Sequence, residues 1–314
     1  MKPSRFCFAI ALVMLLSVAC RKTVDVNNVQ TLIQTGAELH AVDASGDTIV
    51  AVGGARFDYG SIFVSYDAGQ NWQRFDSISI KALYAVQMVT PTRFIATGFE
   101  GKLFESSDAG QTWQFTQLHW NNIRAVHAND TAMWMCGGKG LDNGFVTRHT
   151  NPSSPNDYAL DTFQHELRSL LRTPDSTLYC GGYGIVMRSH DEGITWQPTS
   201  AESDFFIGLV FVNGTLYAAG MNGTVLESTD GGDTWEHVKR GNNPVNVKTL
   251  WNAFAADDEG LLLVGENGKC FFSNGGKWQR LDLGTAEDFT GIAIATDAYV
   301  LTTRQGSMLR FPRL

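Results

Sequence analysis

Short apolar runs recur at a nearly constant spacing along this chain. From residue 37 onward they open repeat units at positions 39, 83, 123, 167, 207, 250 and 289. The mean step of about 42 residues is the length of a four-stranded propeller blade. A second run in each unit ends at a Gly-rich turn, as in Ala51 to Gly54. These runs are apolar on both faces, which is expected of a sheet packed between two other sheets.

A polar motif, Ser-x-Asp-x-Gly-x-x-Trp, follows the third run in four of the units. Copies occupy 65–72, 106–113, 189–196 and 228–235, and a degenerate copy runs from Ser273 to Trp278. Ser and Asp bond to nearby backbone groups, Gly supplies backbone freedom, and Trp suits a packed seam. We interpret the motif as a β-hairpin corner, called the Ser-Asp turn below. Its key residues are Asp67, Gly69, Trp72, Asp108, Gly110, Trp113, Asp191, Gly193, Trp196, Asp230, Gly232 and Trp235. The alternative is a Ca²⁺ loop, but each copy offers a single carboxylate where Ca²⁺ takes about six to eight oxygens.

Seven opening runs predict an all-β fold, a seven-bladed β-propeller of four-stranded antiparallel blades closed by an N-terminal strand. The seventh unit ends after its third run, at Met308 to Phe311, and Val24 to Gln34 is available as the missing strand. Such closure also hides sheet edges. The chain then divides into a signal peptide (1–20), a tether with the closing strand (21–36) and the propeller (37–314). Unit three lacks the Ser-Asp turn, so we expect a longer, irregular outer hairpin there.

The first twenty residues predict an export signal. Lys2 and Arg5 precede an apolar run, Phe6 to Leu16, that is too short to span a membrane comfortably. Small residues before Cys20 resemble a bacterial lipobox, which predicts lipidation of Cys20 and a lipid anchor as the only membrane contact. The alternative is an ordinary signal peptide cut near Ala19. Arg21, instead of Asp, after the cysteine favours the outer membrane as the destination.

Charge and cysteine content narrow the class of partner. The net charge is −8, and it becomes −10 once Lys2 and Arg5 are removed with the signal. An acidic chain argues against nucleic acid and against electrostatic binding to anionic lipid. Cys136 and Cys180 lie in equivalent runs of successive units. We interpret them as small buried hydrophobic residues, with a disulfide between them as the alternative. The cysteine and histidine spacing predicts no metal site, and we expect no cofactor.

The repeated Ser-Asp turns resemble those of the Asp-box, or BNR, propellers. The Gly-x-x-Gly hairpins at 98–101, 220–223 and 265–268 and the bare seven-unit length are most similar to the photosystem II stability/assembly-factor-like proteins. The resemblance covers 37–314. It is specific for fold and weak for function, because the same turn occurs in sialidases, xyloglucanases, sortilin-type receptors and assembly factors.

The resemblance implies that binding occurs on the face opposite the Ser-Asp turns. The loops expected on that face contain Arg56, Tyr59, Phe99 and Tyr183, and also Arg304. The beginnings of the opening runs place five further candidates near the channel mouth: His40, Tyr84, Arg124, Arg168 and Trp251. A mixture of aromatic and polar groups around one opening is typical of a binding surface. Ordinary loop composition is the alternative for any single residue.

These observations favour a monomeric, non-catalytic scaffold that binds a protein or peptide in the cell envelope. Arg124 and Arg168 would contact carboxylates or backbone carbonyls. The alternative function is a glycoside hydrolase of sialidase-like or xyloglucanase-like type, which needs two carboxyl groups about 5 to 9.5 Å apart. The candidate acids on the expected face are Asp58, Glu100, Asp204 and Glu266, but their loops belong to different units.

Overall fold

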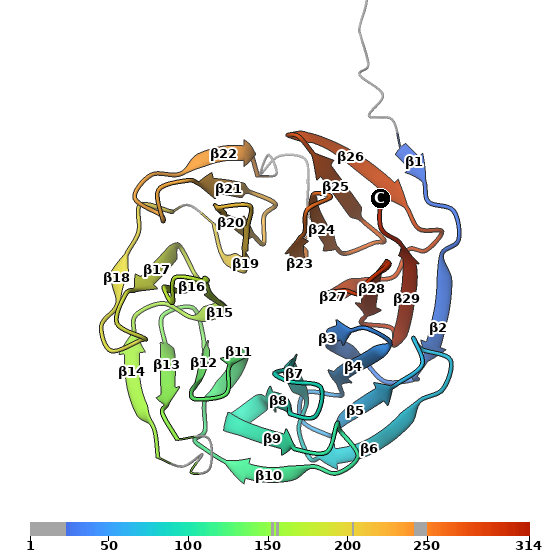
Figure 1. Cartoon of the computed structure of the whole chain (residues 1–314), viewed down its shortest axis with the longest axis horizontal. Helices are drawn as coiled ribbons and strands as arrows, with labels where there is room; N and C mark the ends of the chain where they lie inside the picture. The colour runs from blue at the N-terminus through green and yellow to red at the C-terminus, as the bar shows by residue number, and fades with distance from the viewer. Residues whose placement is uncertain (1–22, 152–153, 155–156, 203, 242–249) are drawn as a thin grey trace, which may run out of the picture.

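The protein is a ring of seven small β-sheets around a central axis (Figure 1). The computed structural model describes residues 23–151, 154, 157–202, 204–241 and 250–314. Cys20 and the predicted signal peptide lie outside the described residues. The predicted seven-bladed β-propeller of antiparallel blades is confirmed.

Each blade runs from an inner first strand to an outer fourth strand. Blades one to four contain β3 (Leu39–Ser45), β4 (Thr48–Gly53), β5 (Gly60–Ser65) and β6 (Gln73–Ser79); β7 (Leu83–Met88), β8 (Phe94–Gly98), β9 (Lys102–Ser106) and β10 (Gln114–Gln117); β11 (Asn122–Ala128), β12 (Met133–Gly138), β13 (Gly144–His149) and β14 (Ala159–Phe163); and β15 (Leu167–Arg172), β16 (Leu178–Gly182), β17 (Ile185–Ser189) and β18 (Gln197–Pro198). A short 3₁₀ turn, η1 (Phe99–Gly101), joins β8 to β9.

The remaining blades follow the same order. Blades five to seven contain β19 (Phe206–Val212), β20 (Thr215–Gly220), β21 (Val225–Ser228) and β22 (Glu236–Lys239); β23 (Trp251–Ala256), β24 (Leu261–Gly265), β25 (Cys270–Asn274) and β26 (Lys277–Asp282); and β27 (Phe289–Ile294), β28 (Ala298–Thr303) and β29 (Ser307–Pro312). The β13–β14 connection in blade three spans nine residues, as its missing Ser-Asp turn predicts.

The N-terminal segment holds two blades. β2 (Gln30–Gln34) pairs antiparallel with β29 and supplies the fourth strand of blade seven, so the predicted closure is confirmed. The sequence did not predict a role for the N-terminal segment in a second blade. β1 (Thr23–Asp25) pairs in parallel with β26 and becomes a fifth strand of blade six. Val24, Val26 and Val29 pack against the core between these two blades, which explains why the segment stays on the ring.

Burial follows strand position within each blade. The second and third strands of blade one, β4 and β5, are buried almost throughout, whereas β6 is mostly exposed. The inner strands therefore carry apolar side chains on both faces and pack against neighbouring blades, for example Phe63 against Val300 and Met308 of blade seven in one cluster. The core is a series of layers between blades, in keeping with the unbroken apolar runs of the sequence.

The four Ser-Asp turns share one hydrogen-bond pattern. In blade two, the Ser106 hydroxyl donates to Asp108 Oδ1 at 2.7 Å and accepts from Gly110 N at 2.8 Å, and Thr112 N donates to the same carboxylate at 2.9 Å. The bonds from Thr112 and Ser106 hold the pKa of Asp108 at about 2. Gly110 has φ 85°, in the left-handed region that favours glycine. The predicted hairpin corner is thus present, at the β9–β10 connection and its equivalents.

A β-bulge occurs at the same place in the first strand of every blade. In blade one, Leu39 pairs with Gly53 and Ala41 pairs with Val52, so His40 is the extra residue. The register shifts in the same way in blades two to seven. A side chain on Gly53 would collide with the carbonyl of Glu38, which explains the glycine that ends β4. A glycine stands at the equivalent position in blades one to six, whereas Thr303 occupies it in blade seven.

Candidate functional site

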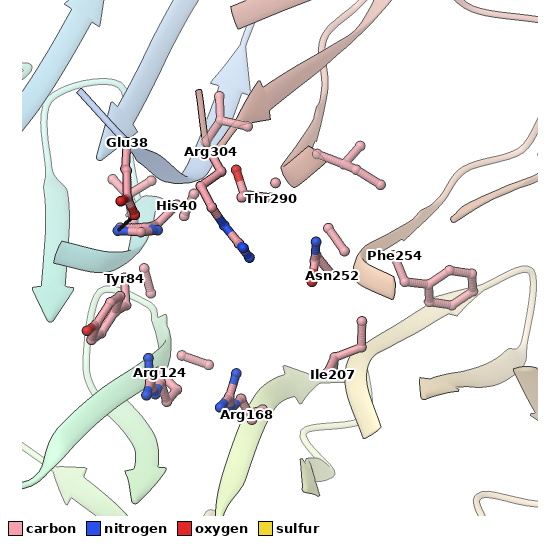
Figure 2. A pocket seen from close by; sticks show the side chains of 18 of the residues that line it. Glu38, His40, Tyr84, Arg124, Arg168, Ile207, Asn252, Phe254, Thr290 and Arg304 are labelled. Atoms are coloured by element: carbon pink, nitrogen blue, oxygen red, sulfur yellow. Dashed lines mark ion pairs between the residues drawn. The ribbon is translucent and has the colours of Figure 1, made fainter. Parts of the chain in front are cut away.

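The seven bulges deliver one side chain per blade to the mouth of the central cavity. These side chains, called the bulge ring below, are His40, Tyr84, Arg124, Arg168, Ile207, Asn252 and Thr290, and Figure 2 shows them around the opening. All seven line a cavity of about 770 Å³. A bulge re-aims a side chain that regular pairing would send into the sheet packing. The site is therefore a repeated backbone device that carries different residues.

The part of the cavity wall next to the bulge ring is built from small side chains. The residue after the bulge is small in the blades that contribute it to the cavity, namely Ala41, Ala85, Ala125, Ala253 and Gly291. Small residues here leave room between the inner strands. The cavity is therefore deep enough for a side chain or a chain end to enter from the mouth.

Arginines dominate the charge of the cavity. Arg56 and Arg304, from the loops after the second strands of blades one and seven, join Arg124 and Arg168 in its lining, whereas Glu38 is the one carboxylate among the described lining residues. Arg304 lies 3.8 Å from Asp288. Arg56 makes no ion pair with a carboxylate of the described chain. The cavity therefore carries positive charge, although the chain as a whole has a net charge of −8.

One buried carboxylate serves two of these arginines. Glu166 Oε1 lies 3.2 Å from Arg168 Nε and 3.7 Å from Arg124 Nε, and its side chain is 6% exposed. Arg124 Nε is buried and has no hydrogen-bond partner within the described residues. Burial, followed by the nearby Arg168 charge, lowers the pKa of Arg124, although an arginine remains protonated. One carboxylate shared by two guanidiniums leaves a net positive charge that an anion could neutralise.

Aromatic rings stack beside the arginines on the side of blades one and two. The Arg124 guanidinium lies 4.3 Å from the centroid of the Tyr84 ring, and the Tyr84 and His40 rings meet edge to face at 5.3 Å. Arg56 lies over both Phe57 and Phe99, at 5.0 and 5.3 Å. These contacts hold both cations in place.

His40 is held as a neutral hydrogen-bond donor. Its Nε2 lies 2.9 Å from the carbonyl oxygen of Gly54, so that nitrogen carries the proton. Burial is the main cause that lowers the pKa of His40. The ring therefore adds shape and polarity to the mouth near neutral pH, but not charge.

The other side of the bulge ring is neutral and internally bonded. Asn252 Nδ2 donates to the carbonyl oxygen of Phe289 at 2.7 Å, and the Thr290 hydroxyl donates to that of Leu39 at 2.8 Å. Each of these bonds reaches the first strand of the next blade. Asn252 and Thr290 therefore tie blades six, seven and one together instead of presenting charge to the cavity, and Ile207 adds an apolar side chain.

The structure brings five of the nine predicted binding residues into the cavity lining. They are His40, Arg56, Tyr84, Arg124 and Arg168. Phe99 is buried beneath Phe57, and Tyr183 lies on the same face, 46% exposed, against Phe205. Tyr59 does not line the cavity. The predicted face is thus the one that carries the opening, and these residues occupy different depths on it.

Trp251 lies elsewhere than predicted. It is 3% exposed and packs against Phe271 in the core of blade six, because Trp251, like Leu39, occupies the position before the bulge. The sequence alignment began blade six at Leu250 and blade five at Ile207, where the structure places Trp251 and Phe206, and so misplaced both registers by one residue. A shift by one residue in a strand exchanges the two faces, and Asn252 is the residue on the bulge ring.

Sequence reasoning also missed Glu166, Asn252 and Thr290 as site residues. Glu166 stands two positions before Arg168, as Glu38 stands two before His40, and both acids contact the basic side chain that follows. This acid-x-base pattern at the start of a unit was a usable signal. Asn252 could have been found only with the correct register in blade six, whereas Thr290 directly follows Phe289, as His40 follows Leu39.

The acids proposed for a glycosidase do not meet in the cavity. Asp58, Glu100, Asp204 and Glu266 are absent from its lining. Asp204 is buried and accepts bonds from the backbone N–H groups of Phe205 and Asn222, at 2.7 and 3.1 Å, which is a structural role in the blade link. Glu266 accepts a bond from Leu250 N at 3.2 Å.

Other chemistry leaves few traces in the described part of the chain. Cys136, Cys180 and Cys270 are buried free thiols there, so the alternative of a Cys136–Cys180 disulfide is not realised. Burial raises the pKa of the Cys270 thiol. The described residues contain no group of three or more His, Cys, Asp or Glu side chains placed to hold a metal ion, and none of their helices has the length and apolar character needed to cross a bilayer.

Comparison with known proteins adds structural neighbours. No protein-family model and no curated protein sequence matches the chain. A solved structure described as YCF48 bound to D1 peptide is similar, with 16% identity and a TM-score of 0.70 over 93% of this chain and 99% of that one. YCF48 from Cyanidioschyzon merolae has 13% identity and a TM-score of 0.68 over 90% and 98%. The RRP9 WD40 repeats have 9% identity and a TM-score of 0.73 over 93% and 99%. These likenesses support the fold alone.

Proposed function

We propose that this propeller is a non-catalytic scaffold that binds a carboxylate-bearing peptide segment at the mouth of its central cavity. The observation that carries the proposal is the cationic half of the bulge ring, where Arg124 and Arg168 share Glu166 and leave positive charge uncompensated. Arg56 and Arg304 add two further guanidiniums from the loops. Guanidinium groups bind carboxylates in a bidentate, directional manner.

The same geometry favours binding over glycoside hydrolysis. A glycosidase needs two carboxyl groups that face one sugar, whereas the described lining carries Glu38 and four arginines. The YCF48 neighbour described as bound to a D1 peptide gives a precedent for peptide binding on this fold. Peptide binding is therefore the function for which the site has groups in place.

The proposal can be tested with fluorescent octapeptides in which half of the positions are Asp or Glu, beside matched peptides with Asn and Gln. We expect the acidic peptides to bind by fluorescence anisotropy and the amide peptides to bind at least about tenfold more weakly, a difference of about 1.4 kcal/mol. An Arg124→Gln/Arg304→Gln variant should lose this preference, because Glu166 keeps Arg168 while two of the four guanidiniums that line the cavity are removed.

The matched control is Arg240→Gln/Arg280→Gln, which removes two exposed arginines outside the cavity. It should bind as the wild type does, with both variants folded by circular dichroism. Equal binding of acidic and amide peptides would contradict the proposal. Release of reducing sugar from a polysaccharide panel, without peptide binding, would support a glycosidase instead.

The location of this function is proposed from the sequence. We place the protein in the bacterial envelope, anchored through a lipid on Cys20 and favouring the outer membrane, with its partner there. Incorporation of labelled palmitate into the wild type and its loss in Cys20→Ser would support the anchor. Equal labelling of both chains would contradict it.

A further inference from the structure

Half of the large apolar side chains that are exposed in the described part of the chain lie on the face that carries the cavity mouth. Six of the twelve large hydrophobic residues that are exposed in the described part of the chain lie in the loops of this face: Phe57, Ile80, Trp120, Leu141, Tyr183 and Leu250. The first five belong to blades one to four or to the links that join them. This is the same side of the opening on which the bulge ring is cationic.

Three of these residues, called the apolar arc below, lie in successive loops of this face, in blade one and in the links from blade one to two and from two to three. Phe57, Ile80 and Trp120 are 65, 73 and 72% exposed. The ammonium group of Lys81, which follows Ile80, lies 5.2 Å from the Phe57 ring centroid, and that ring meets Phe99 at 5.2 Å. Glu100, next to Phe99, bonds through its backbone N–H to Asn122, two residues after Trp120. These contacts connect the loops that carry the three residues across blades one, two and three.

The arc and the arginines are joined by shared contacts. Arg56 lines the cavity and also stacks on Phe57 and Phe99. Tyr84, on the bulge ring, lies against Phe99 at 6.4 Å and under Arg124. A ligand bound to the guanidiniums would therefore have an exposed aromatic surface beside it, within the reach of a neighbouring side chain.

We infer that the partner is a peptide segment in which a bulky apolar side chain lies a few residues from a carboxylate, with the carboxylate in the cavity and the apolar side chain on the arc. This inference rests on the proposed function and deepens it. Single exposed hydrophobic residues need no explanation, but a clustered patch beside a binding cavity does. Aromatic anchors supply much of the energy of peptide interfaces, and charged groups fix their register.

A peptide fits this surface better than a lipid bilayer does. The arc lies beside a cavity lined by arginines and Glu38, and a flat hydrocarbon surface would leave these charges without water or partners. The net charge of −8 also opposes an anionic membrane. An extended chain can place one side chain on the arc and another in the cavity.

The test uses an array of random octapeptides and the full propeller, residues 21–314, with three variants. The arc variant is Phe57→Ser/Ile80→Ser/Trp120→Ser, and the cavity variant is Arg124→Gln/Arg304→Gln. The control variant, Phe115→Ser/Leu160→Ser/Ile194→Ser, removes apolar residues that are exposed away from the mouth. Circular dichroism and thermal unfolding confirm that each variant is folded.

We expect wild-type and control proteins to select peptides with an aromatic or branched apolar residue within three positions of Asp or Glu. The arc variant should still select acids but lose the apolar preference, and it should bind an apolar-acidic octapeptide about tenfold more weakly, the effect of about 1.4 kcal/mol. Binding of an octapeptide that contains acids without apolar residues should not change.

Three results would overturn the inference while leaving the proposed function intact. The arc variant would bind both peptides as the wild type does, or the wild type would bind the apolar-acidic and acid-only peptides equally. Alternatively, the wild type but not the arc variant would bind phosphatidylcholine vesicles, which would make the arc a membrane surface. If the wild type itself did not select peptides that contain Asp or Glu, that result would instead reject the proposed function.

Discussion

One face of this propeller repeats a set of side chains, whereas the other face repeats a backbone conformation. On one face, four hairpins repeat the same side chains, and Ser106, Asp108 and Gly110 make the same bonds as their equivalents in blades one, four and five. On the other face the backbone repeats, as seven identical bulges, while the side chain at the bulge changes from blade to blade. Repeated side chains serve the fold, which all blades share. Varied side chains on a repeated backbone serve a task that the blades divide between them.

The sharpest test of this contrast compares two neighbouring residues of blade six. Trp251→Ala should lower the free energy of unfolding by about 4 kcal/mol, because a large buried side chain is replaced by a cavity. Asn252→Ala should lower it by about 1 kcal/mol, the value of the hydrogen bond to Phe289. Urea denaturation measures both values. A larger loss for Asn252→Ala would mean that the bulge lies at another residue.

A second test separates stability from binding on the mouth face. Glu166→Gln should destabilise the fold by about 2 kcal/mol, since it breaks a mostly buried ion pair whose arginines keep some contact with water. The same change removes a negative charge from beside the cavity, so acidic octapeptides should bind more tightly. Thermal unfolding and fluorescence anisotropy check the two effects, with Glu202→Gln as the exposed control. Weaker peptide binding by a folded Glu166→Gln protein would contradict the charge argument.

The smallest effect on stability is expected for a substitution in a Ser-Asp turn, on the face opposite the mouth, and only at acidic pH. The pKa of Asp108 is held at about 2 by its bonds to Thr112 and Ser106. A lowered pKa in the folded state gives stability that is complete above the unfolded value of about 4 and is lost as the pH falls toward 2. Asp108→Asn should therefore flatten the fall in unfolding temperature between pH 4 and pH 2 and leave peptide binding at pH 7 unchanged. An identical pH profile for Asp108→Asn and wild type would show that the turn does not couple folding to protonation.

The sequence predicted the turn face better than the mouth face for a physical reason. The Ser-Asp turn is local, and its Ser, Asp, Gly and Trp occur within eight residues, so the pattern contains the whole interaction. The blade count and the closing strand β2 could be predicted in the same way, from the spacing of apolar runs. β1 could not, because blade six already has four strands of its own and no missing strand in its repeat indicated a further partner.

The mouth face depends on register, which the sequence specified only in part. His40, Tyr84, Arg124 and Arg168 were found because their blades begin with an apolar residue followed by a polar or aromatic one. In blade six, Leu250 and Trp251 are both apolar, so the alternation did not fix which of them begins the strand. The role of Glu166 needed the distances to two arginines that come from different blades.

The bulge ring also has a consequence for how such proteins can change. Because each blade contributes one ring residue through the same backbone, any of the seven can be exchanged without altering the strand that carries it, provided that no bond to the next blade is lost. His40, Tyr84 and Ile207 are freer in this respect than Asn252 and Thr290, whose bonds bridge blades. The mouth is thus an evolvable surface on an invariant frame, and a library limited to the ring positions without a hydrogen bond to another blade would explore new ligands at low cost to folding.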